Sequence, residues 1–231
     1  MWLKMQTMRS MRINLHAHTT YSSDGLSRMD EMAEAARQNG HCCLCVTDHD
    51  SAFIQNPKIF MKQLCEAECL SKAMNFPIIV GMEIILPPVE ITLPYEEALL
   101  FGHSAIAKWL DFHNKGRHLG KFYQRISFLP FQDECYAMVL AHPRLVGGVV
   151  HQAVLSCHGY EAANRGYRTD PEIVALLDSL PMAGHRRFTN SDAHECGCFS
   201  EPGRLLYNRA RKPITNEREL ISWIRGDKAL A

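Results

Sequence analysis

Short apolar runs alternate along the whole chain with segments whose apolar residues recur at helical spacing. The runs that we expect to form strands are 12–17, 42–47, 77–81, 98–102, 137–141, 154–160 and 187–190. The segments that we expect to form helices are 29–39, 57–74, 171–180 and 216–225. Strands that alternate with helices build βα units and a mainly parallel sheet. About seven strands in one domain favour a barrel over an open sheet.

Residues at the segment ends support this division. Ser27 and Asp30 have the spacing of a capping box, and Gly40 stops the helix that follows. Asn56 and Pro57 begin the long second helix, and Gly226 ends the last one. Residues 105–136 are the least regular stretch, and we expect helix and loop there that cover the active site.

No repeat or linker divides the chain, so we expect a single domain over 1–231 with a loose N-terminal segment at 1–11. Lys plus Arg and Asp plus Glu both number 25, which argues against long nucleic acid as a partner. No apolar run reaches the ~18 residues of a membrane span, so no membrane partner is expected. The nine cysteines include a Cys196-x-Cys198 without a second pair, which does not predict structural zinc. We interpret the thiols as reduced and the protein as cytoplasmic.

Side chains of metal-ligand type follow nearly every predicted strand. These residues are His16, His18, Asp24, His49, Glu83, His103, His142, Asp192 and His194. The carboxyl ends of strands are where barrels and α/β sheets build their active sites. Residues i and i+2 of a strand point the same way, so His16 and His18 can bind one ion together. Asp192 and His194 repeat this spacing near the other end of the chain.

The donor types indicate which ions would bind. A carboxylate such as that of Glu83 has two oxygens and can bridge two ions. A mixture of imidazole and carboxylate suits Zn, Mn or Fe(II) rather than Ca, with Mg also possible. We therefore expect two or three divalent metal ions as cofactors.

Several of these residues also have an ordinary structural interpretation. His103 has little motif around it and could be a hydrogen-bonded core residue. Asp48 could orient a ligand or cap a strand end. Glu161 could be a supporting acid of the site or a surface ion-pair partner. Arg144 and Arg204 could bind a phosphate group or be solvated loop charges.

Six short motifs in order resemble the PHP (polymerase and histidinol phosphatase) superfamily. They are His16-Ala17-His18 with Asp24-Gly25, Thr47-Asp48-His49-Asp50, Gly81-Met82-Glu83, His103, Ala141-His142-Pro143 and Ser191-Asp192-Ala193-His194. The resemblance runs from residue 13 to about 195. Each motif alone is weak, and the ordered set is specific.

The resemblance implies a distorted (β/α)7 TIM-like barrel, the PHP fold, with a site for two or three metals. By position, the first ion would take His16, His18, Glu83 and Asp192. The second would take Glu83, His103 and His142, and the third Asp24, His49 and His194. Asp24 stands where some trinuclear members have His, so the third position could bind more weakly or take another ion.

The resemblance further implies a metal-dependent phosphoesterase. The expected substrate is a small phosphorylated molecule, either a phosphate monoester or a small phosphodiester, with Asp192 and His194 near the leaving group. Two other functions remain open. One is an amidohydrolase-like C–N hydrolase, which a pocket without cations would favour. The other is an accessory PHP domain of a replication assembly. The sequence identifies neither the substrate nor the oligomeric state.

Overall fold

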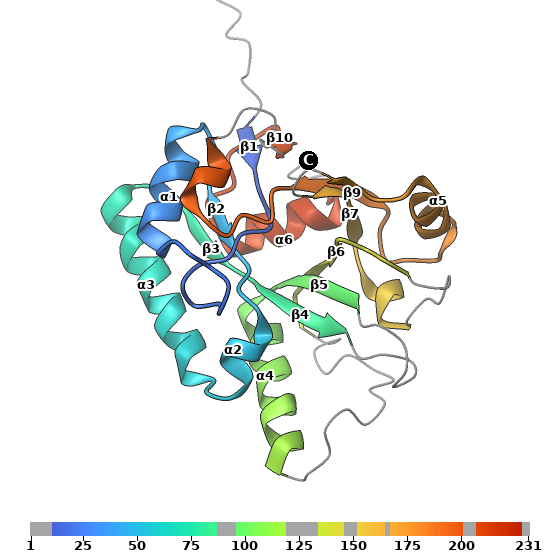
Figure 1. The fold of residues 1–231 in the computed structure, drawn as a ribbon, viewed down its shortest axis with the longest axis horizontal. Helices are drawn as coiled ribbons and strands as arrows, with labels where there is room; N and C mark the ends of the chain where they lie inside the picture. Colours follow the sequence, from blue (N-terminus) through green and yellow to red (C-terminus); the bar gives the residue numbers. More distant parts are fainter. Residues whose placement is uncertain are drawn as a thin grey trace, which may run out of the picture.

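The computed structural model describes residues 11–86, 96–118, 134–145, 152–164, 167–200 and 207–227. They form a mixed α/β protein whose strands are flanked by helices (Figure 1). The strands are β1 (Met11–Ile13), β2 (Leu44–Val46), β3 (Ile78–Val80), β4 (Met82–Leu86), β5 (Glu96–Phe101), β6 (Ala137–Ala141), β7 (Gly159–Asn164), β8 (Tyr167–Arg168), β9 (Arg186–Asn190) and β10 (Asn208–Ala210).

The helices lie around these strands, with α1 and α3 on one side and α5 on the other in Figure 1. The α-helices are α1 (Met29–Gln38), α2 (Asp50–Ile54), α3 (Lys58–Met74), α4 (His103–His118), α5 (Pro171–Ser179) and α6 (Glu217–Arg225). Two 3-10 helices, η2 (Gln152–Ser156) and η3 (Cys196–Phe199), complete the described elements. No helix in the described ranges is long and apolar enough to cross a membrane.

The strands pair in three sheets of mixed direction. β4, β5, β6, β7 and β8 follow one another in the largest sheet, and β9 pairs with β7. β2 pairs with β3, and β1 pairs with β10. β5 runs antiparallel to both β4 and β6, whereas β6, β7 and β9 are parallel. The predicted strands are mainly parallel, as expected, and β5 is the exception, because it runs opposite to the neighbours on both of its sides.

Three parallel bridges connect the sheets to one another. They join Arg12 to His41, Ala17 to Ala193 and His49 to Glu83. Consequently the carboxyl ends of β1, β2, β4, β6, β7 and β9 lie at one end of the strands, which we call the site end. Because β5 is reversed, its amino end lies at the site end. The described strands form three sheets that are joined by single bridges. This strand pairing defines a mixed α/β fold.

Both faces of the strands are buried, which explains their nearly continuous apolar sequences. Cys43 and Cys45 of the β2 region share one core with Trp223 and Ile224 of α6. Leu44 and Val46, which alternate with those cysteines, lie in a second core among the residues of α1 and α3. Cys43 and Cys45 thus behave as small buried apolar residues.

Helix ends agree with the sequence to within a few residues. At α1 the capping pair is Arg28 and Glu31, because the Arg28 N–H donates to Glu31 Oε2 at 2.8 Å. The hydroxyl of Ser27 instead accepts from the Cys196 N–H at 3.0 Å. Asn216 caps α6 by accepting from the Glu219 N–H, and Gly226 ends that helix at a φ of 80°.

Two segments differ from the sequence prediction. The first three residues of the expected strand 154–160 belong to η2, and β7 begins only at Gly159. Glu161 is therefore the third residue of a strand rather than the residue after one. The expected cover at 105–136 contains most of α4, and its remainder up to 133 lies outside the described residues.

Candidate metal centre

Acidic and imidazole side chains gather at the site end. Four groups have ligand atoms that all lie within 4.8 Å of one another. The groups are His18, Asp24, His49 and His194; His16, His142 and Asp192; His16, His18 and Glu83; and His49, Glu83 and Glu97. Eight of the nine predicted ligands are in these groups, and His103 is not.

Glu83 lies at the centre of the cluster and is 1 % exposed. Its Oε1 is 3.2 Å from His16 Nε2 and 3.1 Å from His142 Nε2. Its Oε2 is 3.3 Å from His18 Nε2 and 3.1 Å from His49 Nδ1. Each oxygen of this carboxylate therefore faces two imidazoles, which is the arrangement that a bridging ligand requires.

The donor atoms fit divalent cations. His16 Nδ1 lies 2.9 Å from Glu161 Oε1, so a neutral His16 donates there and directs the lone pair of Nε2 at the cluster. His16 Nε2 and His18 Nε2 are only 3.0 Å apart. Glu83 Oε2 is buried without a hydrogen bond. Lone pairs that converge without protons between them are typical of a metal site.

Asp192 completes the buried side of the cluster. Its Oδ1 is 3.3 Å from His16 Nε2 and 3.2 Å from His18 Nε2. Its backbone has a φ of 48°, and that of His142 has a φ of 24°. Left-handed backbone at residues other than glycine is strained and is found preferentially at functional sites.

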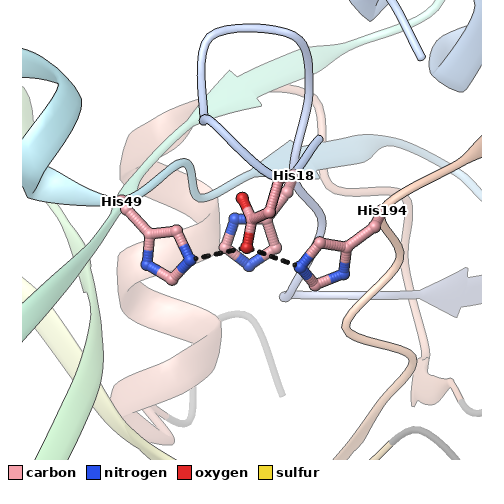
Figure 2. Close-up of side chains that lie close together, drawn as sticks. His18, His49 and His194 are labelled. Atoms are coloured by element: carbon pink, nitrogen blue, oxygen red, sulfur yellow. Dashed lines mark hydrogen bonds and ion pairs between the residues drawn. The ribbon is translucent and has the colours of Figure 1, made fainter. Parts of the chain in front are cut away.

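The exposed side of the cluster is built around Asp24. Its Oδ2 is 3.1 Å from His49 Nε2 and 3.0 Å from His194 Nε2. Figure 2 shows His49 and His194 on either side of His18, with their rings turned towards this shared oxygen. The Asp24 side chain is 43 % exposed, so the cluster is open to solvent here.

Charges within the cluster control its protonation. Burial opposes ionisation of Glu83, but His16 and the hydrogen bonds of neighbouring imidazoles hold its pKa well below the ordinary value. Burial also opposes the charge of Asp192, and His16 and His18 again lower its pKa. The pKa of His49 is raised to about 9, since Glu83 and Asp24 outweigh its burial. The carboxylates are therefore ionised and attract cations.

Three buried acids hold the loops of the site through backbone N–H groups. Asp48 accepts from the Thr19 N–H at 2.6 Å and fixes the turn after His18. Glu96 accepts from the N–H groups of Arg144 and Leu145 at 3.1 and 2.8 Å. These contacts act on the loops rather than on the cluster itself.

Glu161 is the third of these acids and is fully buried. Besides its contact with His16, it accepts from the His142 N–H at 2.8 Å. The side-chain amides of Asn164 and Asn190 donate to it at 2.6 and 2.8 Å. Of the two interpretations that the sequence left open, the structure places Glu161 behind the site and not on the surface.

The direction of β5 determines which of its residues reaches the cluster. His103 follows the carboxyl end of β5, and its Nε2 lies 3.1 Å from Glu217 Oε1 of α6. At the amino end, Glu97 Oε2 lies 3.5 Å from His142 Nε2. Sequence reasoning missed Glu97 because it looked for ligands only at the carboxyl ends of the predicted strands. Glu97 directly precedes the predicted strand 98–102, and an acid at that position was the signal that could have found it.

The structure describes one of the two arginines that the sequence predicted to bind phosphate. Arg144 is exposed in the loop after His142, and its positive charge lowers the pKa of Glu97, although burial and Glu83 raise it overall. Arg204 lies outside the described residues.

The fold and the donor groups define a mixed α/β protein with His/Asp/Glu clusters capable of binding metal. Residues 14–143, more than half of the chain, match the PHP domain. The chain therefore belongs to the PHP domain family, as the ordered motifs indicated.

Solved structures with a similar fold include two enzymes. One is a proposed metal-dependent phosphoesterase from Bifidobacterium adolescentis, with a TM-score of 0.51 and 16 % identity over 91 % of this chain and 95 % of the other. The second is an amidohydrolase from Chromobacterium violaceum with bound sulfate and no metal, with a TM-score of 0.51 and 15 % identity over 94 % and 95 %. No protein with a curated description is similar enough to count as a match.

Proposed function

We propose that this protein is a metal-dependent phosphoesterase that hydrolyses a phosphate monoester or a small phosphodiester. The observation that carries the proposal is Glu83, whose two buried oxygens each face two imidazoles. A centre of this kind suits several ions held side by side. Its open side at Asp24 leaves room for a substrate.

We assign the candidate ligands to three positions. The first comprises His16, His18, Glu83 and Asp192. The second comprises Glu83, His142 and Glu97. The third comprises Asp24, His49 and His194, and His18 is close enough to supply its nitrogen there instead of to the first position. When bound, divalent ions lower the pKa of water towards neutrality and neutralise charge on phosphoryl oxygens.

The chain's own residues would then position the substrate and move a proton. His194 Nδ1 is 2.8 Å from the Asp192 carbonyl oxygen, so a neutral His194 keeps its Nε2 directed at the open side. We propose that His194 and Asp192 serve the leaving oxygen there. Arg144 would bind the phosphoryl group, since its charge already reaches Glu97. The role of Arg204 in binding phosphate stays a prediction from the sequence.

We also infer that the three sheets together approximate a distorted seven-stranded barrel. The support is that single bridges join β1 to the β2 region, the β2 region to β4, and the β1 region to the segment after β9. Both faces of the strands are buried, as a barrel requires.

A panel of phosphate monoesters and small phosphodiesters, assayed with Mn, Zn, Fe(II) or Mg, tests the function. We expect turnover with at least one ion and a loss of at least ~100-fold in His16→Ala. His185→Ala, an exposed histidine away from the candidate groups, is the matched control and should retain activity. Absence of phosphate release with every ion, from folded and metal-loaded protein, contradicts the proposal.

The same donors are chemically compatible with C–N hydrolysis, and the fold is shared with the amidohydrolase from Chromobacterium violaceum. The exposed Arg144 favours an anionic substrate over a neutral amide. An amide and lactam panel run beside the phosphate panel separates the two reactions. Turnover of amides alone would replace the main proposal with this one.

A further inference from the structure

We propose that two of the metal positions in the centre differ in chemical character. One is an imidazole-rich position around Asp24 that favours zinc. The other is a carboxylate-rich position formed by Glu83, Glu97 and His142 that favours a harder ion such as Mn²⁺ or Mg²⁺. This inference rests on the proposed metal centre but does not depend on which reaction is catalysed.

The imidazole-rich position has three nitrogen donors and one oxygen donor. Nitrogens of His18, His49 and His194 and an oxygen of Asp24 all lie within 4.8 Å of one another. Asp24 Oδ2 is about equally far from His49 Nε2 and His194 Nε2, at 3.1 and 3.0 Å. Four donors of this kind match the coordination number and ligand types of zinc.

His49 cannot serve both positions as a neutral ring. Its Nε2 faces Asp24, and its Nδ1 faces Glu83 Oε2 at 3.1 Å. A neutral imidazole has one lone pair in the ring plane and one N–H. If Nε2 binds an ion beside Asp24, Nδ1 carries the proton and donates towards Glu83.

The second position is then left with one nitrogen donor. His142 Nε2 lies 3.1 Å from Glu83 Oε1 and 3.5 Å from Glu97 Oε2. Two carboxylates and one imidazole make it richer in oxygen than the position around Asp24. Oxygen donors suit Mg and Mn better than they suit softer ions.

Two observations support a cation at this position. Glu83 is 1 % exposed, and its Oε1 faces His142 Nε2 at 3.1 Å. Glu97 is 15 % exposed and close to the Glu83 charge. Two carboxylates in a largely buried place repel each other unless a positive charge lies between them.

Zinc binds more tightly than manganese at almost any protein site, so the test compares variants rather than raw affinities. Metal-stripped protein receives one equivalent of Co²⁺ as a spectroscopic substitute for zinc, and its visible absorption reports tetrahedral binding. Mn²⁺ is then titrated into the same sample, and its free fraction is measured by electron paramagnetic resonance. Neither readout depends on hydrolysis.

We expect wild type to show tetrahedral cobalt bands and a tight Mn²⁺ site. Glu97→Gln should keep the cobalt bands and weaken Mn²⁺ at least ~10-fold. Asp24→Asn should weaken the cobalt bands and keep Mn²⁺. His103→Asn, altered at the residue that the reversed β5 places away from the cluster, is the control and should match wild type in both signals.

Two results would overturn the proposal. One is a Mn²⁺ affinity in Glu97→Gln that equals wild type. The other is the opposite assignment, with cobalt bands lost in Glu97→Gln and retained in Asp24→Asn. Glu97→His provides a second variant that keeps a donor, and it should raise the preference for zinc over manganese. If metal binding behaves as expected but no phosphate ester is cleaved, only the proposed function fails.

Discussion

Glu161 shows how one side chain organises several strand ends. Its two oxygens accept from His16 Nδ1, the His142 N–H, Asn164 and Asn190, so every direction around the carboxylate is used. Four donors thus satisfy the hydrogen-bonding capacity of this buried carboxylate. It also keeps His16 in the tautomer that points Nε2 at the cluster.

Glu161→Gln should therefore damage both the fold and the centre. The amide NH2 of the glutamine replaces an oxygen that accepts hydrogen bonds, so it faces other donors. At least one buried hydrogen bond is then lost, which lowers the free energy of unfolding by about 2–3 kcal/mol. Metal affinity should fall about 10- to 100-fold. Urea denaturation and metal titration measure the two effects.

Glu34→Gln on the solvent-exposed face of α1 is the matched control, because within the described ranges Glu34 bonds to Arg37 and Gln38 on its own helix and to no other residue. It should change the unfolding free energy by less than ~0.5 kcal/mol. Equal stability and equal metal affinity in wild type and Glu161→Gln would contradict the positioning role of Glu161.

At the scale of elements, β7 depends on a close approach to β9. A Cβ on Gly159 would lie 2.3 Å from the Arg186 carbonyl oxygen and 2.6 Å from a Phe188 ring carbon. The carbonyl belongs to the parallel ladder and cannot move independently of it. Glycine is therefore required where these two strands meet.

Gly159→Ala should lower the free energy of unfolding by about 1–3 kcal/mol, because the methyl group overpacks a rigid backbone contact. Gly197→Ala is the control, since among the described residues a Cβ there would come no closer to a non-adjacent residue than 4.0 Å, at Glu195 Cδ. Thermal melting of both variants measures the difference. A Gly159→Ala melting temperature equal to that of wild type would show that the strands separate without cost.

The histidine directly before β7 accepts a hydrogen bond from β6, which its neutral form allows. His158 Nδ1 accepts from the Met138 N–H at 3.2 Å. Burial and, secondarily, the charge of Arg225 lower the pKa of His158 to about 4. In the unfolded chain the same group has an ordinary pKa near 6.5.

Between these two values the unfolded chain binds more protons at His158 than the folded protein does. The contribution of His158 to the free energy of unfolding is complete above pH 6.5. It is lost as the pH falls towards 4, with a slope of up to roughly 1.4 kcal/mol per pH unit. His158→Asn should flatten the dependence of stability on pH in this window. Urea denaturation from pH 4 to 8 tests it, with His185→Asn as the exposed control; identical curves for His158→Asn and wild type would contradict it.

For the whole molecule, metal binding and folding should be coupled. The candidate ligands come from segments that the sequence separates widely, from His16 to His194. Ions that bind this assembly bind the folded state alone, and each contributes about 2.7 kcal/mol at a free concentration of one hundred times Kd. For a chain of this size that is a rise of roughly 5–10 °C in Tm.

Differential scanning fluorimetry with a chelator, and then with Mn²⁺ or Zn²⁺, measures this coupling. His16→Ala should show a much smaller rise than wild type, and His185→Ala should show the full rise. A Tm that is the same with chelator and with saturating Mn²⁺ would contradict metal binding by the folded protein.

The agreement between the elements predicted from the sequence and those in the structure varies along the chain. The extent of β6 at Ala137–Ala141 agrees with its apolar run, and α6 lies within the predicted range and ends at Gly226 as predicted. These features depend on residues near one another in the chain. The strand expected at 154–160 failed because η2 and the beginning of β7 share one apolar run, and only pairing with β6 and β9 separates them.

The sequence by itself determined the donor types and most of their positions, because a His or an acid after a strand has a local pattern. Only the tertiary structure decided that Glu97 joins the cluster while His103 pairs with Glu217. The direction of β5 follows from its antiparallel pairing with β4 and β6, and an apolar run reads the same in either direction. The burial of Glu161 likewise depends on donors from segments far away in the sequence.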